Sequence, residues 1–223
     1  MFITFEGIEG SGKSTQAKEL HKKLNQIGIP SVLTREPGGT EIGASIRKIL
    51  LDARNTGLSG LAELFLYEAD RAQHVEEQII PALNAGQWVI CDRYLDATVA
   101  YQGYARNQDT GLLNALNKHA SHGLLPDVTF LLDCPVEYGL KRARNREAAL
   151  PANKEFGFDR FENENFLFHE KVRAGYLAIA DENPDRFFKI SAIGTIEKVK
   201  EKVWEVISTF IVKKPDSDNT AFV

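Results

Sequence analysis

The glycine-rich run at residues 7–14, Gly-Ile-Glu-Gly-Ser-Gly-Lys-Ser, constrains the fold of this chain more than any other feature. It fits the pattern G-x-x-x-x-G-K-[ST], a phosphate-binding loop. The glycines let the backbone turn its N–H groups toward phosphate oxygens, Lys13 can reach the β- and γ-phosphates, and the Ser14 hydroxyl can ligate Mg²⁺. The apolar run Phe2–Phe5 precedes the loop, and apolar residues at helical spacing follow it. We therefore expect a strand, a loop and a helix whose positive end faces the bound anion.

Short apolar runs along the chain are typical of buried strands, and helical patterns separate them. This alternation predicts an α/β fold with a five-stranded parallel sheet and helices on both faces. The expected strands are Phe2–Phe5, Ser31–Leu33, Trp88–Cys91, Val128–Leu132 and Phe187–Ile190. The later helices are expected at Glu41–Leu51, Leu61–Ala85, Gly111–Ser121, Val136–Glu147, Asn163–Glu182 and Thr195–Ile211. We expect one domain over residues 1–212 and a disordered tail over residues 213–223.

Composition limits the partners and the compartment. The formal net charge of −4 does not indicate a broad surface for nucleic acid or membranes. The only two cysteines, Cys91 and Cys134, each end an apolar run, which predicts small buried residues in a reducing compartment. The chain has no long apolar run, and its first expected strand begins at residue 2, which leaves no room for a signal peptide. We expect a cytoplasmic protein with small-molecule partners.

Ligands of parallel sheets bind at the carboxyl ends of the strands, so the residues after each apolar run are site candidates. Asp92 follows one run and can hold Mg²⁺, usually through water, while Arg93 offers two parallel N–H groups to a phosphate. The alternative is a helix-capping aspartate beside a solvated arginine. Another strand is followed by residues 35–40, Arg-Glu-Pro-Gly-Gly-Thr, where we expect a turn, a Thr40 helix cap and contact with an acceptor substrate.

Two weaker patterns lie on expected helices. Tyr67 and Arg71 are four residues apart, so a ring could stack on a base while the guanidinium binds the base edge. The alternative is an exposed arginine beside a half-buried tyrosine. Six basic residues between 141 and 160 form either a solvated face or a mobile lid, at about residues 142–160, whose arginines stabilise a transferred phosphoryl group. The five histidines have no metal-ligand spacing.

Taken together, these motifs resemble bacterial thymidylate kinases over residues 2 to about 210. The resemblance rests on residues 5–14 (Phe-Glu-Gly-Ile-Glu-Gly-Ser-Gly-Lys-Ser), 35–40, 68–71 (Glu-Ala-Asp-Arg), 92–94 (Asp-Arg-Tyr) and 100–103 (Ala-Tyr-Gln-Gly). It implies transfer of the γ-phosphoryl group of ATP to dTMP, giving dTDP for dTTP biosynthesis, with Mg²⁺ and commonly in a homodimer. The phosphate-binding loop lacks the arginine of the eukaryotic type, so catalytic arginines are expected in the lid.

The resemblance also implies site residues. Tyr67 matches a ring that stacks on thymine, Arg71 a base-edge arginine, and Tyr101 a ring that crowds the sugar 2′ position. The expected dTMP-binding residues are Glu36, Pro37, Tyr67, Arg71, Arg93, Thr98, Tyr101 and Gln102. The expected ATP-binding residues are Gly7, Ile8, Glu9, Gly10, Ser11, Gly12, Lys13, Ser14, Thr15 and Arg142. The expected catalytic residues are Lys13, Arg93, Arg146, Glu9 and Asp92, with Arg142, Arg144 and Arg160 as lid neighbours of Arg146, and the metal ligands are Ser14 and Asp92.

Two other readings remain open at this point. One is a kinase for another nucleotide or a deoxynucleoside, such as dUMP. The other is a non-catalytic nucleotide switch. Guanine-specific switches carry Asn-Lys-x-Asp, and neither Asn117-Lys118-His119-Ala120 nor Asn153-Lys154-Glu155-Phe156 completes that pattern.

Overall fold

Five parallel strands form one sheet, and a computed structural model describes it together with the rest of residues 1–149, 160–161 and 163–211. The strand order is β2-β3-β1-β4-β5, with β1 at the centre. Every predicted strand is present, and each extends one or two residues beyond its predicted end. The bounds are β1 (Phe2–Glu6), β2 (Ser31–Arg35), β3 (Trp88–Asp92), β4 (Val128–Asp133) and β5 (Phe187–Ser191).

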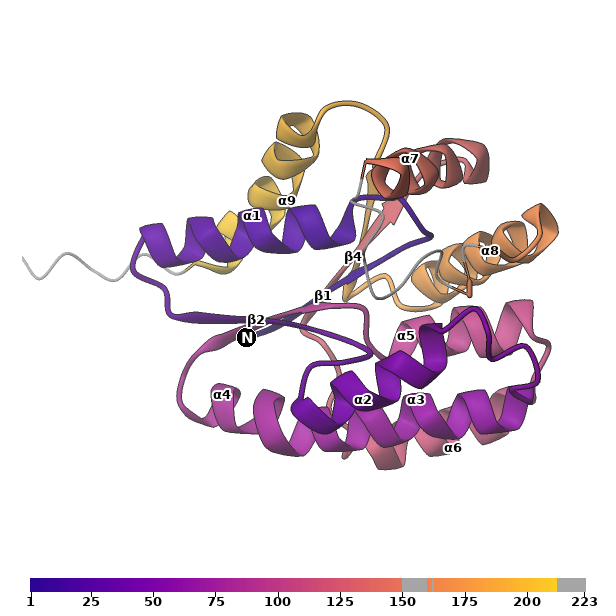
Figure 1. Cartoon of the computed structure of the whole chain (residues 1–223). Helices are drawn as coiled ribbons and strands as arrows, with labels where there is room; N and C mark the ends of the chain where they lie inside the picture. Colours follow the sequence, from indigo (N-terminus) through magenta and orange to yellow (C-terminus); the bar gives the residue numbers. More distant parts are fainter. Residues whose placement is uncertain (150–159, 162, 212–223) are drawn as a thin grey trace, which may run out of the picture.

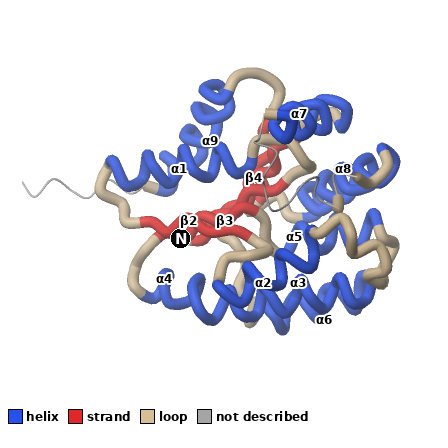
Figure 2. Tube along the Cα trace, viewed as in Figure 1, coloured by secondary structure: helices blue, strands red, loops and turns tan. Residues whose placement is uncertain are grey.

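Helices cover both faces of the sheet, as Figures 1 and 2 show. Helices α1 (Lys13–Gln26) and α9 (Ile196–Phe210) pack together on one face. On the other face lie α2 (Glu41–Leu51), α3 (Gly60–His74), α4 (Ile80–Asn84) and α6 (Thr110–Ala120). Helices α7 (Val136–Ala148) and α8 (Phe166–Glu182) follow β4 in the chain. The predicted fold class is confirmed.

The central strands are buried because each has a neighbour on both sides and helices above and below. All five residues of β1 are buried, and the Phe5 and Phe130 rings of adjacent strands stack with centroids 5.1 Å apart. Leu20 and Leu24 of α1 are buried beside them in the same core. Burying each large apolar side chain contributes about 1.5–3 kcal/mol to folding. This packing fixes the carboxyl ends of β1 and β3 side by side, with Phe5 opposite Asp92.

Two helical stretches differ from the prediction. Residues 95–105, for which no helix was predicted, form α5 (Leu95–Thr98) and the π-helix η2 (Val99–Ala105), which packs along α8. The single helix predicted at Leu61–Ala85 is divided into α3, the π-helix η1 (Val75–Ile79) and α4. Pro81 follows η1 and has no backbone N–H to donate, so the regular ladder cannot continue unchanged through it. π-Helical turns are rare and frequently occur at functional sites.

The predicted lid and tail fall largely outside the described residues. Residues 142–148 of the lid are helical as part of α7, whereas residues 150–159 and 162, and residues 212–223 of the tail, lie beyond the description. No helix among the residues that the structure describes has the length and apolar composition to cross a membrane.

Candidate active site

The phosphate-binding loop joins β1 to α1 in the predicted strand, loop and helix arrangement. Gly7, Gly10 and Gly12 have φ angles of 139°, 70° and 100°, which glycine adopts readily. The Lys13 Nζ donates hydrogen bonds to the carbonyl oxygens of Gly7 (3.0 Å) and Ile8 (2.7 Å). Burial, with the charge of Arg93, lowers the pKa of Lys13 to about 8. The lysine is therefore held inside the loop, where an added anion would favour its charged form.

Helix α7 packs directly on this loop. A Cβ atom on Gly10 would lie 1.9 Å from the Gly139 carbonyl oxygen, and one on Gly139 would lie 2.5 Å from the Glu9 carbonyl oxygen. The two backbones can approach this closely only because both residues are glycine. Arg142 lies one turn beyond Gly139, with a terminal nitrogen 3.8 Å from a Cβ built on Gly12, so it borders the loop.

Asp92 ends strand β3, and it lies next to Ser14 at the end of the phosphate-binding loop. The Ser14 hydroxyl donates a hydrogen bond to the Asp92 carboxylate. No cluster of three His, Cys, Asp or Glu side chains able to hold a metal occurs among the described residues. Mg²⁺ at triphosphate sites usually takes only one or two protein oxygens, with water and phosphate completing its shell. This hydroxyl–carboxylate pair beside the loop therefore fits the predicted metal site.

Arg93 has a strained backbone, with a φ of 72° in a non-glycine residue. Its guanidinium donates to the Gly7 carbonyl oxygen (3.2 Å), the Tyr176 hydroxyl (3.1 Å) and the Glu9 carboxylate (2.9 Å), and it lies over the Tyr101 ring at 4.8 Å. Its side chain is 19% exposed and lines a pocket. The alternative of a solvated arginine is therefore wrong.

Glu9 joins the loop to that pocket. Its carboxylate accepts hydrogen bonds from Arg93, from the Tyr101 hydroxyl (2.5 Å) and from Nδ1 of His169 (3.1 Å). Burial opposes ionisation, but the His169 hydrogen bond and the charges of Arg93 and Lys13 outweigh it, so the pKa of Glu9 lies well below its ordinary value. Glu9 is therefore an anion that holds two groups of the pocket wall.

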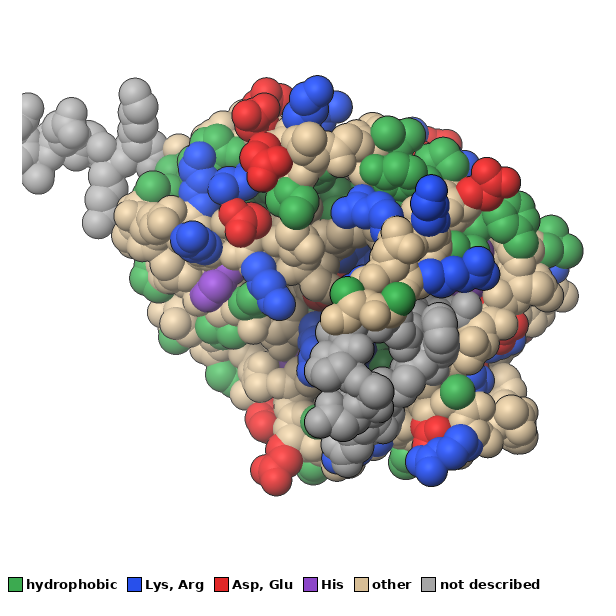
Figure 3. All heavy atoms as spheres, turned by 45° about the horizontal axis from the view of Figure 1, so that its top comes forward, with side chains coloured by type: hydrophobic (Ala, Val, Ile, Leu, Met, Phe, Trp, Pro, Cys, Tyr) green, Lys and Arg blue, Asp and Glu red, His purple; other side chains and the backbone are tan. Residues whose placement is uncertain are grey.

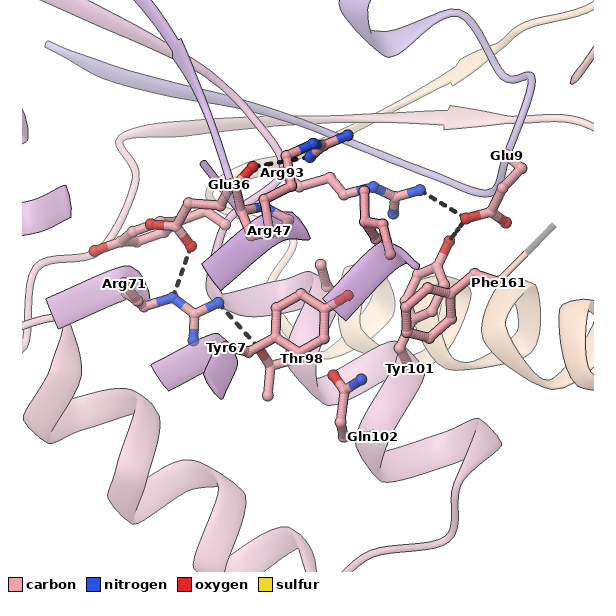
Figure 4. Close-up of a pocket in the computed structure, with 14 residues that line it drawn as sticks. Glu9, Glu36, Arg47, Tyr67, Arg71, Arg93, Thr98, Tyr101, Gln102 and Phe161 are labelled. Atoms are coloured by element: carbon pink, nitrogen blue, oxygen red, sulfur yellow. Dashed lines mark hydrogen bonds and ion pairs between the residues drawn. The ribbon is translucent and has the colours of Figure 1, made fainter. Parts of the chain in front are cut away.

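A pocket opens beside Arg93, between α2, α3 and the α5–η2 segment (Figure 4). Aromatic rings and charged groups line it together, as in sites for small organic ligands. All eight residues predicted to bind dTMP line this pocket, together with Glu9; they are Glu36, Pro37, Tyr67, Arg71, Arg93, Thr98, Tyr101 and Gln102. The structure thus brings together side chains that are up to 93 positions apart in the sequence, from Glu9 to Gln102.

Arg71 forms the buried floor of the pocket, with 1% exposure. Its Nε donates to Glu36 (2.9 Å), one terminal nitrogen donates to Glu68 (2.9 Å) and Asn117 (2.5 Å), and the other donates to Thr98 (2.9 Å). The alternative of an exposed Arg71 is wrong. The carboxylates raise the pKa of Arg71 despite its burial, so a positive charge is fixed at the far end of the pocket.

The predicted lid arginines separate into two places. Arg142 and Arg146 are one turn apart on α7, near the face with Gly139 that contacts the phosphate-binding loop. Arg144 is about 160° away from Arg146 around the helix axis. Arg160 instead donates to Glu63 (2.6 Å) on α3 and to the Leu50 carbonyl oxygen (3.0 Å) at the end of α2, so it supports the pocket wall. Several Lys and Arg side chains lie above the grey residues on the face shown in Figure 3.

Several residues of the site were not predicted. Arg47 and Phe161 line the pocket, and the Arg47 guanidinium donates to the Pro37 carbonyl oxygen (2.8 Å). Arg47 lies on α2, seven residues after the Thr40 cap, and no motif in the sequence marks it as a site residue. His169 and Tyr176 are seven residues apart on α8, a helical spacing that could have indicated a shared face.

Comparison with known proteins gives a consistent result. The family model described as thymidylate kinase matches residues 5–203. A thymidylate kinase of Solidesulfovibrio magneticus is 52% identical over 95% of this chain and all of its own length. One of Desulfovibrio desulfuricans is 50% identical over 96% of this chain and 98% of its own. A crystal structure of thymidylate kinase from Ehrlichia chaffeensis, 36% identical, superposes with a TM-score of 0.73 over 93% of this chain and 98% of the other.

Proposed function

This chain belongs to the thymidylate kinase family, and we propose how its site carries out the reaction of that family. The chain is a nucleoside monophosphate kinase that transfers the γ-phosphoryl group of ATP to dTMP, giving ADP and dTDP. The observation that carries the proposed mechanism is the pocket lined by Tyr67, Arg71, Arg93 and Tyr101, which adjoins the phosphate-binding loop through Glu9. A donor site and an acceptor site are therefore next to each other, as direct transfer requires.

ATP binds at the loop in this proposal. The backbone N–H groups of residues 7–15 surround the β- and γ-phosphates, and Lys13 leaves the Gly7 and Ile8 carbonyl oxygens to pair with them. Arg142 supports this position because it borders Gly12. Arg146, one turn further along α7, stabilises the charge on the transferred group. No covalent intermediate is needed, since positioning and electrostatics account for this class of reaction.

dTMP binds in the pocket. Its thymine stacks on Tyr67 with an edge hydrogen-bonded to Arg71, and its phosphate meets Arg93, which aims it in line with the γ-phosphate. Tyr101 is 6% exposed and hydrogen-bonded to Glu9, so its ring is held still. A fixed ring at the sugar leaves little room for a 2′-hydroxyl and so favours a deoxyribonucleotide.

Mg²⁺ is the metal that we propose for this reaction. The Ser14 hydroxyl and the Asp92 carboxylate, already in contact, would hold it or its waters. Held there, the metal would neutralise part of the negative charge on the phosphates.

We further propose that the protein is a cytoplasmic homodimer. The free, buried Cys91 and Cys134 support a reducing compartment. Apolar side chains that are 45–55% exposed lie on the adjacent helices α2 and α3, and they support an interface there; these are Ile42 (55%), Ile49 (46%), Leu61 (49%) and Phe65 (51%).

Formation of ADP from ATP and Mg²⁺ with separate acceptors tests the function. The acceptors are dTMP, dUMP, UMP, dCMP, AMP and thymidine. Strong turnover with dTMP alone is expected. Preference for another acceptor would contradict the roles of Tyr67, Arg71 and Tyr101, whereas slow ADP formation that no acceptor increases would favour a nucleotide switch.

A further inference from the structure

The two carboxylate oxygens of Glu9 have different partners. Oε1 accepts hydrogen bonds from Arg93 (2.9 Å) and Tyr101 (2.5 Å), both drawn in Figure 4. Oε2 accepts from Nδ1 of His169 (3.1 Å). His169 does not line the nucleotide pocket. One oxygen therefore holds the pocket wall, and a histidine behind the wall holds the other.

His169 is fully buried in the first turns of α8, with an exposed fraction of 0%. An ionised carboxylate only accepts hydrogen bonds, so Nδ1 must carry the hydrogen. The Nε2 atom is buried and has no hydrogen-bond partner in the described part of the chain. Two turns further along α8, the Tyr176 hydroxyl accepts from Arg93. Helix α8 thus contacts both members of the Glu9–Arg93 ion pair.

The terminal torsion of a glutamate has a broad energy minimum, so hydrogen bonds must fix the plane of its carboxylate. Without His169, the buried Oε2 would have no donor, which is unfavourable. Lys13 is a second cation whose charge acts on Glu9. A carboxylate that turned toward Lys13 would weaken its hydrogen bonds to Tyr101 and Arg93.

We propose that His169 is a positioning residue, whose Nδ1–H group fixes the Glu9 carboxylate so that Oε1 holds Arg93 and the Tyr101 ring in the positions that receive dTMP. This inference rests on the proposed function of the pocket. His169 acts through Glu9 and does not touch the nucleotide. Its loss should therefore change the KM for dTMP and the choice between 2′-deoxy and 2′-hydroxy nucleotides, and leave the KM for ATP nearly unchanged.

The test compares His169→Leu with His169→Asn. Leucine has no donor, whereas the asparagine amide can donate from near the position of Nδ1. Steady-state rates are measured with dTMP, with ribothymidine 5′-monophosphate and with varied ATP. For His169→Leu we expect the KM for dTMP to rise roughly tenfold to hundredfold, with a smaller preference for dTMP over the ribonucleotide. His169→Asn should restore most of both.

A buried apolar residue of the same helix provides the control, because Val172→Ala removes packing there without removing a hydrogen-bond donor. Asparagine is smaller than leucine and leaves more empty space in the core. We therefore expect His169→Asn to melt at a lower temperature than His169→Leu, although its kinetics are closer to those of the wild type. Wild-type KM and selectivity in His169→Leu would overturn the proposal, as would equal losses in the Leu and Asn variants.

A measurement on the wild-type protein covers the case in which the leucine variant does not fold. Nitrogen-15 NMR of the His169 ring should show a hydrogen on Nδ1, in a signal that shifts when dTMP is added. A ring protonated only at Nε2 would contradict the proposal. If the wild-type protein formed no dTMP-dependent ADP, the proposed function would fail instead.

Discussion

Among single residues, Glu6 is a buried carboxyl group that the proposed reaction does not use. Its two oxygens accept hydrogen bonds from the Tyr94 backbone N–H and the Tyr176 hydroxyl, each at 2.7 Å. Burial, together with the charge of Asp96, raises the pKa of Glu6 from 4.5 to about 8. The folded protein therefore binds this proton more tightly than the unfolded chain does.

This raised pKa predicts a loss of stability with rising pH. The contribution of Glu6 is fully present below pH 4.5 and is lost as the pH rises to about 8. At about 1.4 kcal/mol per pH unit, the loss is on the order of a few kcal/mol. Glu6→Gln cannot ionise, so its free energy of unfolding should fall less between pH 5 and 8. Urea denaturation at several pH values measures this. Exposed Glu137→Gln is the control, and parallel curves for wild type and Glu6→Gln would contradict the assignment.

The sequence indicated the position of single residues where the signal lies in their immediate neighbours. The loop lysine, Asp92 and Arg93 could be located because each follows a buried strand. Tyr67 and Tyr101 depended on the family resemblance, since a tyrosine on a helix carries no sign of its ligand. His169 could not be found in this way, because its partner Glu9 is 160 positions away and only the packing of α8 brings them together.

Among the elements, strands were easier to predict than the helices of the pocket. Apolar runs such as those of β1 and β4 are buried on both faces and have few alternatives. Residues 95–105 contain Thr98, Val99 and Gly103, whose helix propensities are low, so local preference did not indicate a helix. Packing on α8 stabilises α5 and η2 there, with the Gly175 position lying against the Tyr104 ring. Tertiary contacts thus decided the structure of the segment that carries Thr98 and Tyr101.

The contact between α7 and the phosphate-binding loop gives a prediction for Gly139→Ala. The new Cβ would lie 2.5 Å from the Glu9 carbonyl oxygen and 2.9 Å from the Ile8 side chain. Alanine favours a helix by about 1 kcal/mol, but here it must push α7 off the loop. We expect a KM for ATP at least tenfold higher, measured in steady-state assays. Gly57→Ala, with no atom within 4 Å of its Cβ, should bind ATP normally. Unchanged KM in Gly139→Ala would show that the contact is not needed.

The arginines of α7 lie on different sides of the helix, so we expect their substitutions to have unequal effects on the rate of phosphoryl transfer. Arg146 is near the loop-facing side with Gly139, whereas Arg144 is nearly opposite. Arg146→Ala should lower kcat by about 10³-fold, since an arginine that stabilises phosphoryl transfer is worth 10³–10⁵ in rate. Arg144→Ala, which also removes an exposed arginine from this helix, should keep nearly normal turnover. Single-turnover phosphoryl transfer measures both. Equal rates for the two variants would reject the assignment of Arg146.

On the scale of the whole molecule, two helices that form the acceptor pocket, α2 and α3, also carry the proposed interface. Helices α2 and α3 supply Arg47, Tyr67 and Arg71 to the pocket, while other faces of the same helices expose Ile42, Ile49, Leu61 and Phe65. The exposed residues are spaced seven apart on α2 and four apart on α3, so each pair shares a helix face. A partner on that surface would therefore stabilise the helices that form the pocket.

This arrangement predicts that breaking the proposed dimer also weakens dTMP binding. Phe65 is 51% exposed on α3, and a Phe65→Asp substitution would place a charge in an apolar interface. We expect light scattering to show a dimer for wild type and a monomer for Phe65→Asp, with a KM for dTMP raised severalfold. Ile27→Asp, at a residue 49% exposed at the end of α1 on the other face of the sheet, tests a similar substitution away from this surface and should stay dimeric. A wild-type monomer with full activity would reject the interface, and a monomeric Phe65→Asp with unchanged KM would show that the pocket forms without a partner.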